Sequence, residues 1–466
     1  MLRTRLRSGH WRSRLTRRSR HLAQAGLTVL LAAGLLGAVG LLARQGVVWL
    51  LARQEYRDRD QARAAGTRPQ RSPAVAWPVG SGSAGWVARE NQRPGTTAWR
   101  ITDLGAADAV EGYTDHVSAQ RGDRIRLFVS TSRAALLVQN AVTTWQAYNL
   151  WGGFDLYQGP GGAFSTRSRV VSFDRPYGQA GQGAGDFLGN EYPLVRLVES
   201  LGLDVTYWTD VDLHERPAWL GRHRALVSLG HDEYWSTAMR GGAEVARDRG
   251  VNLAFLGANA VFRHIRLAPS PLGADREEIN YKPQSARSDP AWRTDPKEVT
   301  TDWREPPLDD PESTLLGDLY ECNPVDAAGV VVDPSAWVFA GTGVQPGTRL
   351  PGLIGPEYDR VQAGAPRPAG VELLLHSPLR CRGHASLADV TYYTAQSGAG
   401  VFDTGTSSWV CQLDAACADH RNAPATARVV RQATVNLLRA FAEGRAGRGW
   451  PARPNLSRFH IAPSGL

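Results

Sequence analysis

The chain contains the sequence Gly230-His231-Asp232-Glu233-Tyr234-Trp235-Ser236 directly after a short apolar run, Ala225-Leu226-Val227-Ser228-Leu229. The apolar run predicts a buried strand, and residues 234–248 predict a helix. Three ionisable side chains therefore crowd the turn at the carboxyl end of a strand, where open α/β sheets place their ligand sites. A turn that only joins two elements needs Gly, Asn or Ser, so this composition predicts a functional site.

Asp232 also has a simpler interpretation. Aspartate is a common N-cap, and Glu233 would then be favoured by the dipole of the helix that follows. This alternative leaves His231 and the two aromatic residues without a role, so we favour the functional interpretation.

The chain around this turn alternates between predicted strands and helices. Strands are predicted at residues 136–141, 204–208, 225–229 and 251–256, and helices at residues 192–201, 234–248 and 426–442. Such alternation is typical of a parallel sheet with helices on both faces. We therefore predict an α/β fold with a doubly wound, mostly parallel sheet.

The formal net charge of +8 and the pI near 9.5 suggest a nucleic-acid ligand at first sight. Eight arginines between residues 3 and 20 account for this excess, and the rest of the chain is close to neutral. Only Lys282 and Lys297 among the 53 basic residues are lysines, which leaves 51 arginines and indicates a bias in genomic base composition. No nucleic-acid motif is present, so we predict no nucleic-acid partner.

Residues 22–43 carry no charge and are long enough to cross a bilayer as a helix, and a second apolar run ends at residue 52. The preceding arginine cluster places the N-terminus in the cytoplasm and the main domain outside, by the positive-inside rule. A cleaved signal peptide is the alternative, but Ala62-Arg63-Ala64 lies too far beyond the apolar core to be its cleavage site. We therefore predict a single-pass membrane protein with an N-terminal transmembrane helix.

The predicted organisation has six parts. They are a basic cytoplasmic segment (1–21), a transmembrane anchor (22–52), a linker (53–95), a remnant β module (96–133), the main domain (134–445) and a C-terminal tail (446–466). The four cysteines would lie in an oxidising compartment, where disulfides are allowed. The short loop favours pairing Cys411 with Cys417, which leaves Cys322 with Cys381.

Polar side chains also follow two other predicted strands. Tyr148 lies in the loop after residues 136–141, and Asn259 lies in Gly257-Ala258-Asn259 after residues 251–256. The loops after these strands share one edge of a doubly wound sheet, so we expect Tyr148, His231, Glu233 and Asn259 to converge. Taken singly, Tyr148 could be a core aromatic and Asn259 a turn residue.

Phenolate and carboxylate oxygens suit a highly charged, oxygen-preferring metal ion, whereas zinc normally draws on His and Cys. A metal held by Tyr148 and Glu233 could polarise a carbonyl and activate water. His231 could then shuttle a proton, and Asn259 could hydrogen-bond the substrate. A zinc site that uses His231 is the competing interpretation. Glu357, among turn residues 356–359, either enters the site or orders a turn.

These motifs resemble the C-terminal domain of the large (beta) subunit of N,N-dimethylformamidase. The resemblance covers about residues 90–440 and rests on Thr144-Trp145-Gln146-Ala147-Tyr148-Asn149-x-Trp151-Gly152-Gly153, Gly230 to Ser236, Gly257-Ala258-Asn259 and Gly398-Ala399-Gly400-Val401-Phe402. It implies a class I glutamine-amidotransferase-like fold without the cysteine nucleophile, and a mononuclear ferric ion, Fe(III), held by two tyrosines and a glutamate. Carried over, Tyr148 and Glu233 match metal ligands, His231 and Asn259 match neighbouring catalytic positions, and Glu357 matches a further acidic site residue.

The chain departs from that family in one region. Members usually carry a complete β-sandwich between a segment like Glu111-Gly112-Tyr113 and the strand before Trp145, but here Ser130 and Ala134 are nearly adjacent. The position of the second tyrosine is therefore open, and by order in the sequence Tyr113 is the candidate.

We predict a membrane-anchored, extracytoplasmic, metal-dependent hydrolase of small amide-type C–N bonds. Its partners would be a small-molecule amide or related substrate and the membrane. The alternative is a non-catalytic cell-envelope module that keeps the fold and binds a small or carbohydrate ligand in the cleft.

Overall fold

The structure is a computed structural model that describes residues 110–114, 127–131, 134–178, 184–414 and 423–464. All of these residues lie in one compact unit, Thr102–Leu466. The predicted cytoplasmic segment, membrane anchor and linker, residues 1–95, lie outside the described residues.

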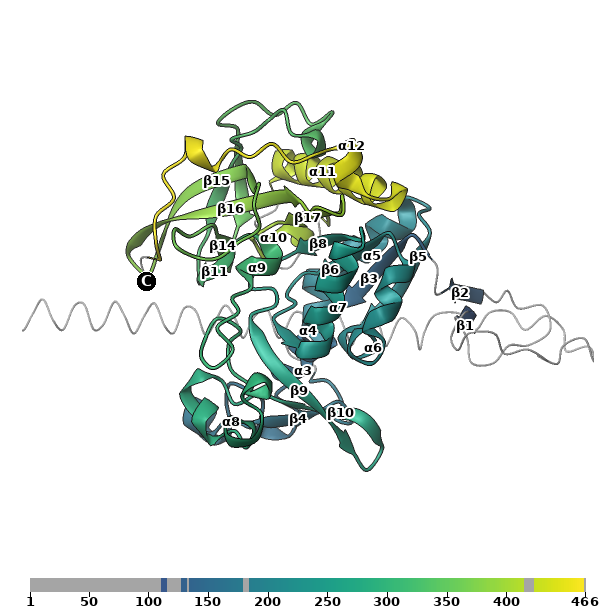
Figure 1. The fold of residues 1–466 in the computed structure, drawn as a ribbon, viewed down its shortest axis with the longest axis vertical. Helices are drawn as coiled ribbons and strands as arrows, with labels where there is room; N and C mark the ends of the chain where they lie inside the picture. The colour runs from purple at the N-terminus through teal and green to yellow at the C-terminus, as the bar shows by residue number, and fades with distance from the viewer. Residues whose placement is uncertain (1–109, 115–126, 132–133, 179–183, 415–422, 465–466) are drawn as a thin grey trace, which may run out of the picture. The chain divides into compact units, whose positions relative to one another are not determined.

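A seven-stranded sheet forms the centre of this unit (Figure 1). Its strands lie in the order β15-β16-β17-β8-β6-β3-β5. Their bounds are β3 Leu136–Asn140, β5 Val205–Thr209, β6 Ala225–Leu229, β8 Asn252–Leu256, β15 Glu372–Cys381, β16 His384–Thr394 and β17 Gly400–Asp403. The neighbours from β17 to β5 pair in parallel, whereas β16 is antiparallel to both β15 and β17.

The predicted doubly wound, mostly parallel fold is therefore wrong, because the central sheet is mixed and the smaller sheets contain mainly antiparallel pairs. The physical reason lies in the connection between β15 and β16, which consists of Arg382 and Gly383 with φ of +47° and +88°. A two-residue connection joins antiparallel strands only. Arg-Gly is not one of the dipeptides that favour such a turn, so the hairpin lacks a clear sequence signal.

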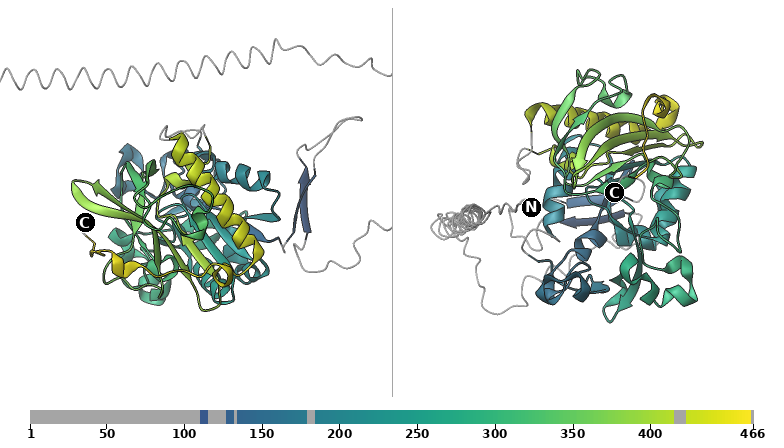
Figure 2. Two further views of the ribbon diagram at one scale, coloured as in Figure 1. Left: turned by 90° about the horizontal axis from the view of Figure 1, so that it is seen from above. Right: turned by 90° about the vertical axis from the view of Figure 1, so that its left-hand side faces the viewer.

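Side chains along the parallel strands alternate between two covered faces. On one face, Val227 and Leu256 belong to the core that includes α5 (Tyr192–Ser200) and α11 (Pro424–Glu443). The view in Figure 2 shows α11, in yellow-green, lying over the strands. On the other face, Leu226 packs in the core that includes α6 (Asp210–Glu215) and α7 (Thr237–Asp248), the second of which carries Met239, Ala243 and Ala246.

Smaller sheets surround the central one. A four-stranded sheet has the order β4-β10-β9-β7, with bounds β4 Val170–Ser172, β7 Tyr234–Ser236, β9 Arg263–Ser270 and β10 Gly273–Ile279. Three strand pairs are β1 Val110–Thr114 with β2 Leu127–Thr131, β11 Leu319–Cys322 with β14 Tyr358–Arg360, and β12 Ala327–Val330 with β13 Arg349–Ile354. The short helices are α3 Val142–Ala147, α4 Ala184–Asp186, α8 Ala291–Thr294, α9 Ser313–Leu316, α10 Ser408–Cys411 and α12 Ala446–Gly449.

The remaining helical elements are short 3₁₀ and π segments. Phe187–Glu191 (η4) is a π-helical turn, and the 3₁₀ turns are η1 Trp151–Gly153, η2 Pro160–Gly162, η3 Phe164–Thr166, η5 Pro217–Arg222, η6 Pro283–Ser288, η7 Pro296–Glu298, η8 Trp337–Phe339 and η9 Leu456–Arg458.

None of the helices in the described residues combines the length and apolar character needed to cross a bilayer. The predicted membrane helix, residues 22–52, lies outside this part of the chain, so the structure gives it no support. The predicted fold is therefore corrected to a mixed sheet, with no support for the membrane helix.

One predicted disulfide is confirmed. Cys322, at the end of β11, is bonded to Cys381, at the end of β15, with Cα atoms 6.4 Å apart. Cys411 is also disulfide-bonded, and its predicted partner, Cys417, lies outside the described residues. The first bond fixes the residue before Asn323 against the hairpin of β15 and β16.

Replacing both Cys322 and Cys381 by alanine is expected to lower the free energy of unfolding by about 2–4 kcal/mol, because the bond closes a long loop in the unfolded chain. Urea unfolding of the full-length protein measures this loss. A double variant as stable as the wild type would show that the bond contributes nothing to the folded state.

Candidate functional site

Two turns at the carboxyl edge of the parallel strands lie in direct contact. Gly230 follows β6 with φ of +58°, and Gly257 follows β8. A Cβ atom on Gly257 would lie 1.4 Å from the carbonyl oxygen of Gly230, and one on Gly230 would lie 2.4 Å from that of Asn190. No side chain fits at either place, so Gly257 is required for the two turns to meet and Gly230 for the close approach of Asn190.

The segment after Gly230 does not begin a helix. Residues 234–236 form β7, which pairs in parallel with β9, and α7 begins only at Thr237 with Ser236 as its N-cap. Asp232 is buried instead, and its carboxylate accepts hydrogen bonds from the side chains of Gln139, Ser228 and Trp235. The N-cap interpretation of Asp232 and the predicted helix start at residue 234 are both wrong.

Two phenols and one carboxylate meet beside these turns. The hydroxyl of Tyr148, the residue that ends α3, donates to Oε2 of Glu233 at 2.8 Å. The hydroxyl of Tyr157 lies 2.9 Å and 3.0 Å from the two carboxylate oxygens of Glu233 and 2.8 Å from the hydroxyl of Tyr148. The two rings stack with their centroids 4.4 Å apart. Three oxygen-bearing side chains thus converge on one point.

Tyr157 is the site residue that sequence reasoning missed. It lies in the irregular segment between α3 and β4, where the carboxylate of Asp155 accepts the backbone N–H groups of Tyr157 and Gln158 at 2.7 Å. Such a segment has no periodicity, so the only signal was a second tyrosine shortly after Tyr148. Tyr113, the predicted second tyrosine, lies in β1, and its side chain is outside the described part, so that prediction remains untested.

Glu233 is 1% exposed and lies between two basic groups. Its Oε1 is 3.0 Å from Nε of Arg263, and its Oε2 is 3.5 Å from Nε2 of His231. Burial alone would raise the pKa of Glu233, but the charges of Arg263 and His231 outweigh burial and lower it. Burial, followed by the charge of Glu233, raises the pKa of both Tyr148 and Tyr157 well above the ordinary value. In the metal-free protein the carboxylate is therefore charged and both phenols keep their protons.

His231 connects Glu233 to a second carboxylate. Its Nε2 lies 3.3 Å from Oε2 of Glu357, whose Oε1 accepts a hydrogen bond from Nδ2 of Asn323 at 2.7 Å. Burial disfavours the charged imidazole, but Glu357 and Glu233 outweigh burial and raise the pKa of His231 to about 10. The imidazole is therefore charged near neutral pH.

Tyr148, Tyr157, His231 and Glu357 face a cavity of about 500 Å³. The side chains that line it come from six segments of the chain and include Tyr148, Tyr157, Asp186, Asn190, His231, Asn323, Pro324, Pro356, Glu357, Ser407 and Cys411. A cavity of this size admits a small molecule.

Asn259 lies in the adjacent turn with φ of +60°. Its backbone N–H donates to both carboxylate oxygens of Asp359, at 2.9 and 3.1 Å, and its side-chain Oδ1 is buried without a hydrogen-bond partner. Among the described residues, no recorded contact joins the Asn259 side chain to Tyr148, His231 or Glu233. The structure therefore brings together Tyr148, His231, Glu233 and Glu357, and leaves the predicted role of Asn259 untested.

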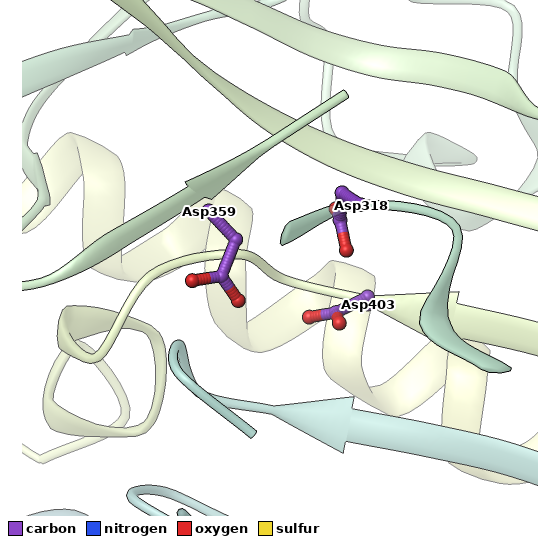
Figure 3. A group of neighbouring side chains, drawn as sticks. All are labelled: Asp318, Asp359 and Asp403. Atoms are coloured by element: carbon purple, nitrogen blue, oxygen red, sulfur yellow. The ribbon is translucent and has the colours of Figure 1, made fainter. Parts of the chain in front are cut away.

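A cluster of three buried carboxyl groups supports the Asn259 turn (Figure 3). It consists of Asp318, Asp359 and Asp403, whose carboxyl oxygens lie within 4.8 Å of one another. Burial, and then the charges of the neighbouring aspartates, raise the pKa of all three well above the ordinary value. No basic side chain in the described residues lies within ion-pair distance of them, so protons must relieve their repulsion in the protein alone.

Tyr148, Tyr157 and Glu233 form the set best suited to a metal ion. Their donor atoms are all hard oxygens, and they would together carry three negative charges when both phenols are deprotonated. Oxygen atoms 2.8–3.0 Å apart have the spacing of adjacent ligands around an ion with bonds of about 2.0 Å. The predicted pairing of Tyr148 with Glu233 is thus consistent with the geometry, and Tyr157 supplies a third donor.

A comparison with protein families gives a match over residues 48–422 to the family described as N,N-dimethylformamidase beta subunit-like, C-terminal. The match spans well over half of the 466 residues. The chain belongs to this family. The resemblance stated from the sequence motifs is therefore confirmed, and a comparison with curated proteins found no match.

The family match includes every residue of the site. In this N,N-dimethylformamidase beta subunit-like chain, the motif at Thr144 to Gly153 supplies Tyr148, and the motif at Gly230 to Ser236 supplies His231 and Glu233. The motif at Gly398 to Phe402 has a structural role instead, because it begins β17, where the N–H of Gly400 donates to Asn252.

Replacing Asp318 by asparagine is expected to stabilise the protein by about 1–3 kcal/mol at about pH 8, because the amide is neutral without taking up a proton and can still donate to Asp403. The pKa values of the three aspartates are raised in the folded state, so the stability they contribute is present at acidic pH and is lost as the pH rises through the folded values. The advantage of the variant should therefore shrink as the pH falls.

Urea unfolding across this pH range measures the effect, with Asp204→Asn as an exposed control. A variant less stable than the wild type at about pH 8 would contradict repulsion within the cluster.

Proposed function

We propose that this chain is an extracytoplasmic hydrolase that cleaves the C–N bond of small amides with the help of a ferric ion. The observation that carries the proposal is the convergence of Tyr148, Tyr157 and Glu233, whose oxygens lie 2.8–3.0 Å apart beside a cavity that the two tyrosines line. The name of the family points to amides as the substrate class.

The donor set favours a trivalent ion over zinc. Two phenolates and a carboxylate match the charge of Fe(III), and all three are oxygen ligands, whereas zinc sites draw on nitrogen and sulfur. The pKa of each phenol is raised by burial, so binding of the ion must release both protons. Once bound, a ferric ion would polarise the amide carbonyl and lower the pKa of a water molecule.

His231 is placed to move a proton during hydrolysis. Water adds its oxygen to the carbonyl carbon, the C–N bond breaks, and the amine nitrogen leaves with an additional proton. Nε2 of His231 lies at the cavity wall between Glu233 and Glu357 and carries a proton near neutral pH. It can deliver this proton to the leaving nitrogen and recover one from the attacking water, so the proton count balances.

Glu357 and the cavity define the remaining parts of the proposal. Glu357 holds the imidazole of His231 and is itself held by Asn323. The cavity of about 500 Å³ suits a small amide rather than a polypeptide. The Cys322–Cys381 bond supports folding in an oxidising compartment outside the cytoplasm.

The full-length protein produced in iron-replete medium is expected to bind about one iron per chain and to show a visible tyrosinate-to-iron absorption band. Tyr148→Phe, Tyr157→Phe and Glu233→Gln should each lose this band, since each removes one of three protein ligands. Tyr207→Phe, a substitution in β5 where the hydroxyl bonds Glu199, is the matched control and should keep it.

Metal analysis and absorption spectra decide the result. A colourless, metal-free wild type would favour the alternative of a non-catalytic binding module, in which the same three side chains form a polar network. Zinc in the purified protein would favour the competing zinc site.

His231→Asn is expected to lower kcat for hydrolysis of small amides such as N,N-dimethylformamide by about 10²–10⁴-fold, because it removes the proton donor. Iron content should be retained, since His231 is not one of the three proposed ligands. Amine release from the full-length protein measures this activity. Unchanged kcat in an iron-loaded variant would remove His231 from the mechanism.

A further inference from the structure

Lys282 is an unusual residue for this chain. Lysine occurs only twice among 53 basic residues, at Lys282 and Lys297. Lys297 is exposed, whereas Lys282 is 1% exposed. Arginine is therefore the usual basic residue of this chain, and Lys282 is its one buried lysine.

The backbone at Lys282 is also unusual. Its φ is +62°, in the left-handed region, which costs a residue with a side chain about 1 kcal/mol or more. Glycine would adopt this conformation without that cost. The presence of lysine at such a position indicates that its side chain has a specific use.

The Lys282 side chain ends at the proposed metal ligands. Its Nζ donates to the hydroxyl of Tyr234 at 2.6 Å and lies 3.8 Å from the ring centroid of Tyr157. The hydroxyl of Tyr234 in turn donates to the hydroxyl of Tyr157 at 2.8 Å. In the described part of the chain no carboxylate lies within ion-pair distance of Nζ, so the amino group is directed at the tyrosines and not at a salt bridge.

The two proposed tyrosine ligands therefore have different surroundings. Tyr157 accepts a hydrogen bond from Tyr234, which is supported by Lys282. For Tyr148, the hydroxyl donates to Glu233 and lies 2.8 Å from the hydroxyl of Tyr157, and these are its hydrogen-bond neighbours among the described residues. If both phenols lost their protons, the oxygen of Tyr157 would still accept a hydrogen bond from Tyr234. The oxygen of Tyr148 would have no such donor among the described residues.

We propose that Lys282 and Tyr234 are positioning residues: Tyr234, held by Lys282, hydrogen-bonds the oxygen of Tyr157 and makes it a weaker electron donor to the metal than Tyr148. This inference rests on the proposed ferric site. Hydrogen bonds from residues behind a metal ligand fix its orientation and change its donor strength. Weaker donation from one phenolate leaves the ion more electron-poor, which favours polarisation of a substrate carbonyl.

The amino group of a lysine suits this place better than a guanidinium. Lysine presents a compact group with tetrahedral donors, which can lie over the face of one ring while it bonds the hydroxyl of another. A planar guanidinium needs a wider, flatter space and a bidentate partner. This difference accounts for a lysine at position 282 in a chain otherwise rich in arginine.

The test uses the full-length, iron-loaded protein and the visible tyrosinate-to-iron band. Lys282→Met keeps the length of the side chain but removes the donor, and Tyr234→Phe removes the hydroxyl that bonds Tyr157. Both variants are expected to retain iron and to move the band to longer wavelength, because Tyr157 becomes a stronger donor. Resonance Raman spectra excited in the band should show a change in one tyrosinate and not in the other.

Lys297→Met, which removes the exposed lysine, is the matched control and should leave the band in place. If the wild type shows the band and neither Lys282→Met nor Tyr234→Phe moves it, the inference is wrong while the metal site stands. A lysine with only a packing role would give that outcome, with reduced stability but an unchanged spectrum. If the wild type shows no band at all, the proposed metal site fails and this inference fails with it.

Discussion

The contact between Gly230 and Gly257 is the constraint on which the site depends. A carbonyl oxygen of one turn occupies the space that a side chain on the other would need. The turns after β6 and β8 can therefore meet only because Gly257 lacks a Cβ atom, and the missing Cβ of Gly230 makes room for Asn190. Their contact sets the path of the chain that follows each turn, and these paths carry Glu233 and Asn259. The backbone then pairs again, since the N–H groups of Phe262 and Arg263 donate to the carbonyl of Glu233.

Around this scaffold the chain holds buried carboxyl groups in two different surroundings. Glu233 lies among Arg263, His231 and Lys282, so its negative charge is retained despite complete burial. On the far side of the Asn259 turn, three aspartates lie without a basic partner in the described residues and hold protons instead. A buried carboxyl group can thus be charged or neutral within one domain, and the neighbouring residues decide which state it adopts.

Much of the central sheet could be predicted from the sequence, because buried strands are short apolar runs bounded by turn residues. The prediction for β6 is correct at both ends, and those for β3, β5 and β8 are correct to within one residue. The direction of β16 could not be predicted, because it depends on a turn formed by Arg382 and Gly383 whose composition carries no clear signal. The β7 strand at residues 234–236 was also missed, since it is held by pairing with β9 and not by its own pattern.

Three of the residues that the structure brings together were predictable because they follow strands, whereas Glu357 was predicted from a turn and the family resemblance. Tyr148, His231 and Glu233 lie directly after strands or their first helical turn, and the structure brings them together. Tyr157 and Lys282 lie in irregular segments, where only the folded chain places them. The motif resemblance identified the family, but the order of residues suggested Tyr113, which stays untested, and did not point to Tyr157, because position along the chain does not determine distance in space.

The place of β17 in the sheet has a consequence for how the protein is made. This strand lies between β8 and β16, although it follows both in the chain, and it joins them by one parallel and one antiparallel pairing. The nascent polypeptide cannot close the sheet until residues 400–403 have left the ribosome, and the entropy of closing such distant segments slows the event. Completion of the sheet should therefore come late in folding, and a prematurely terminated product would expose its unpaired edges to aggregation and proteolysis.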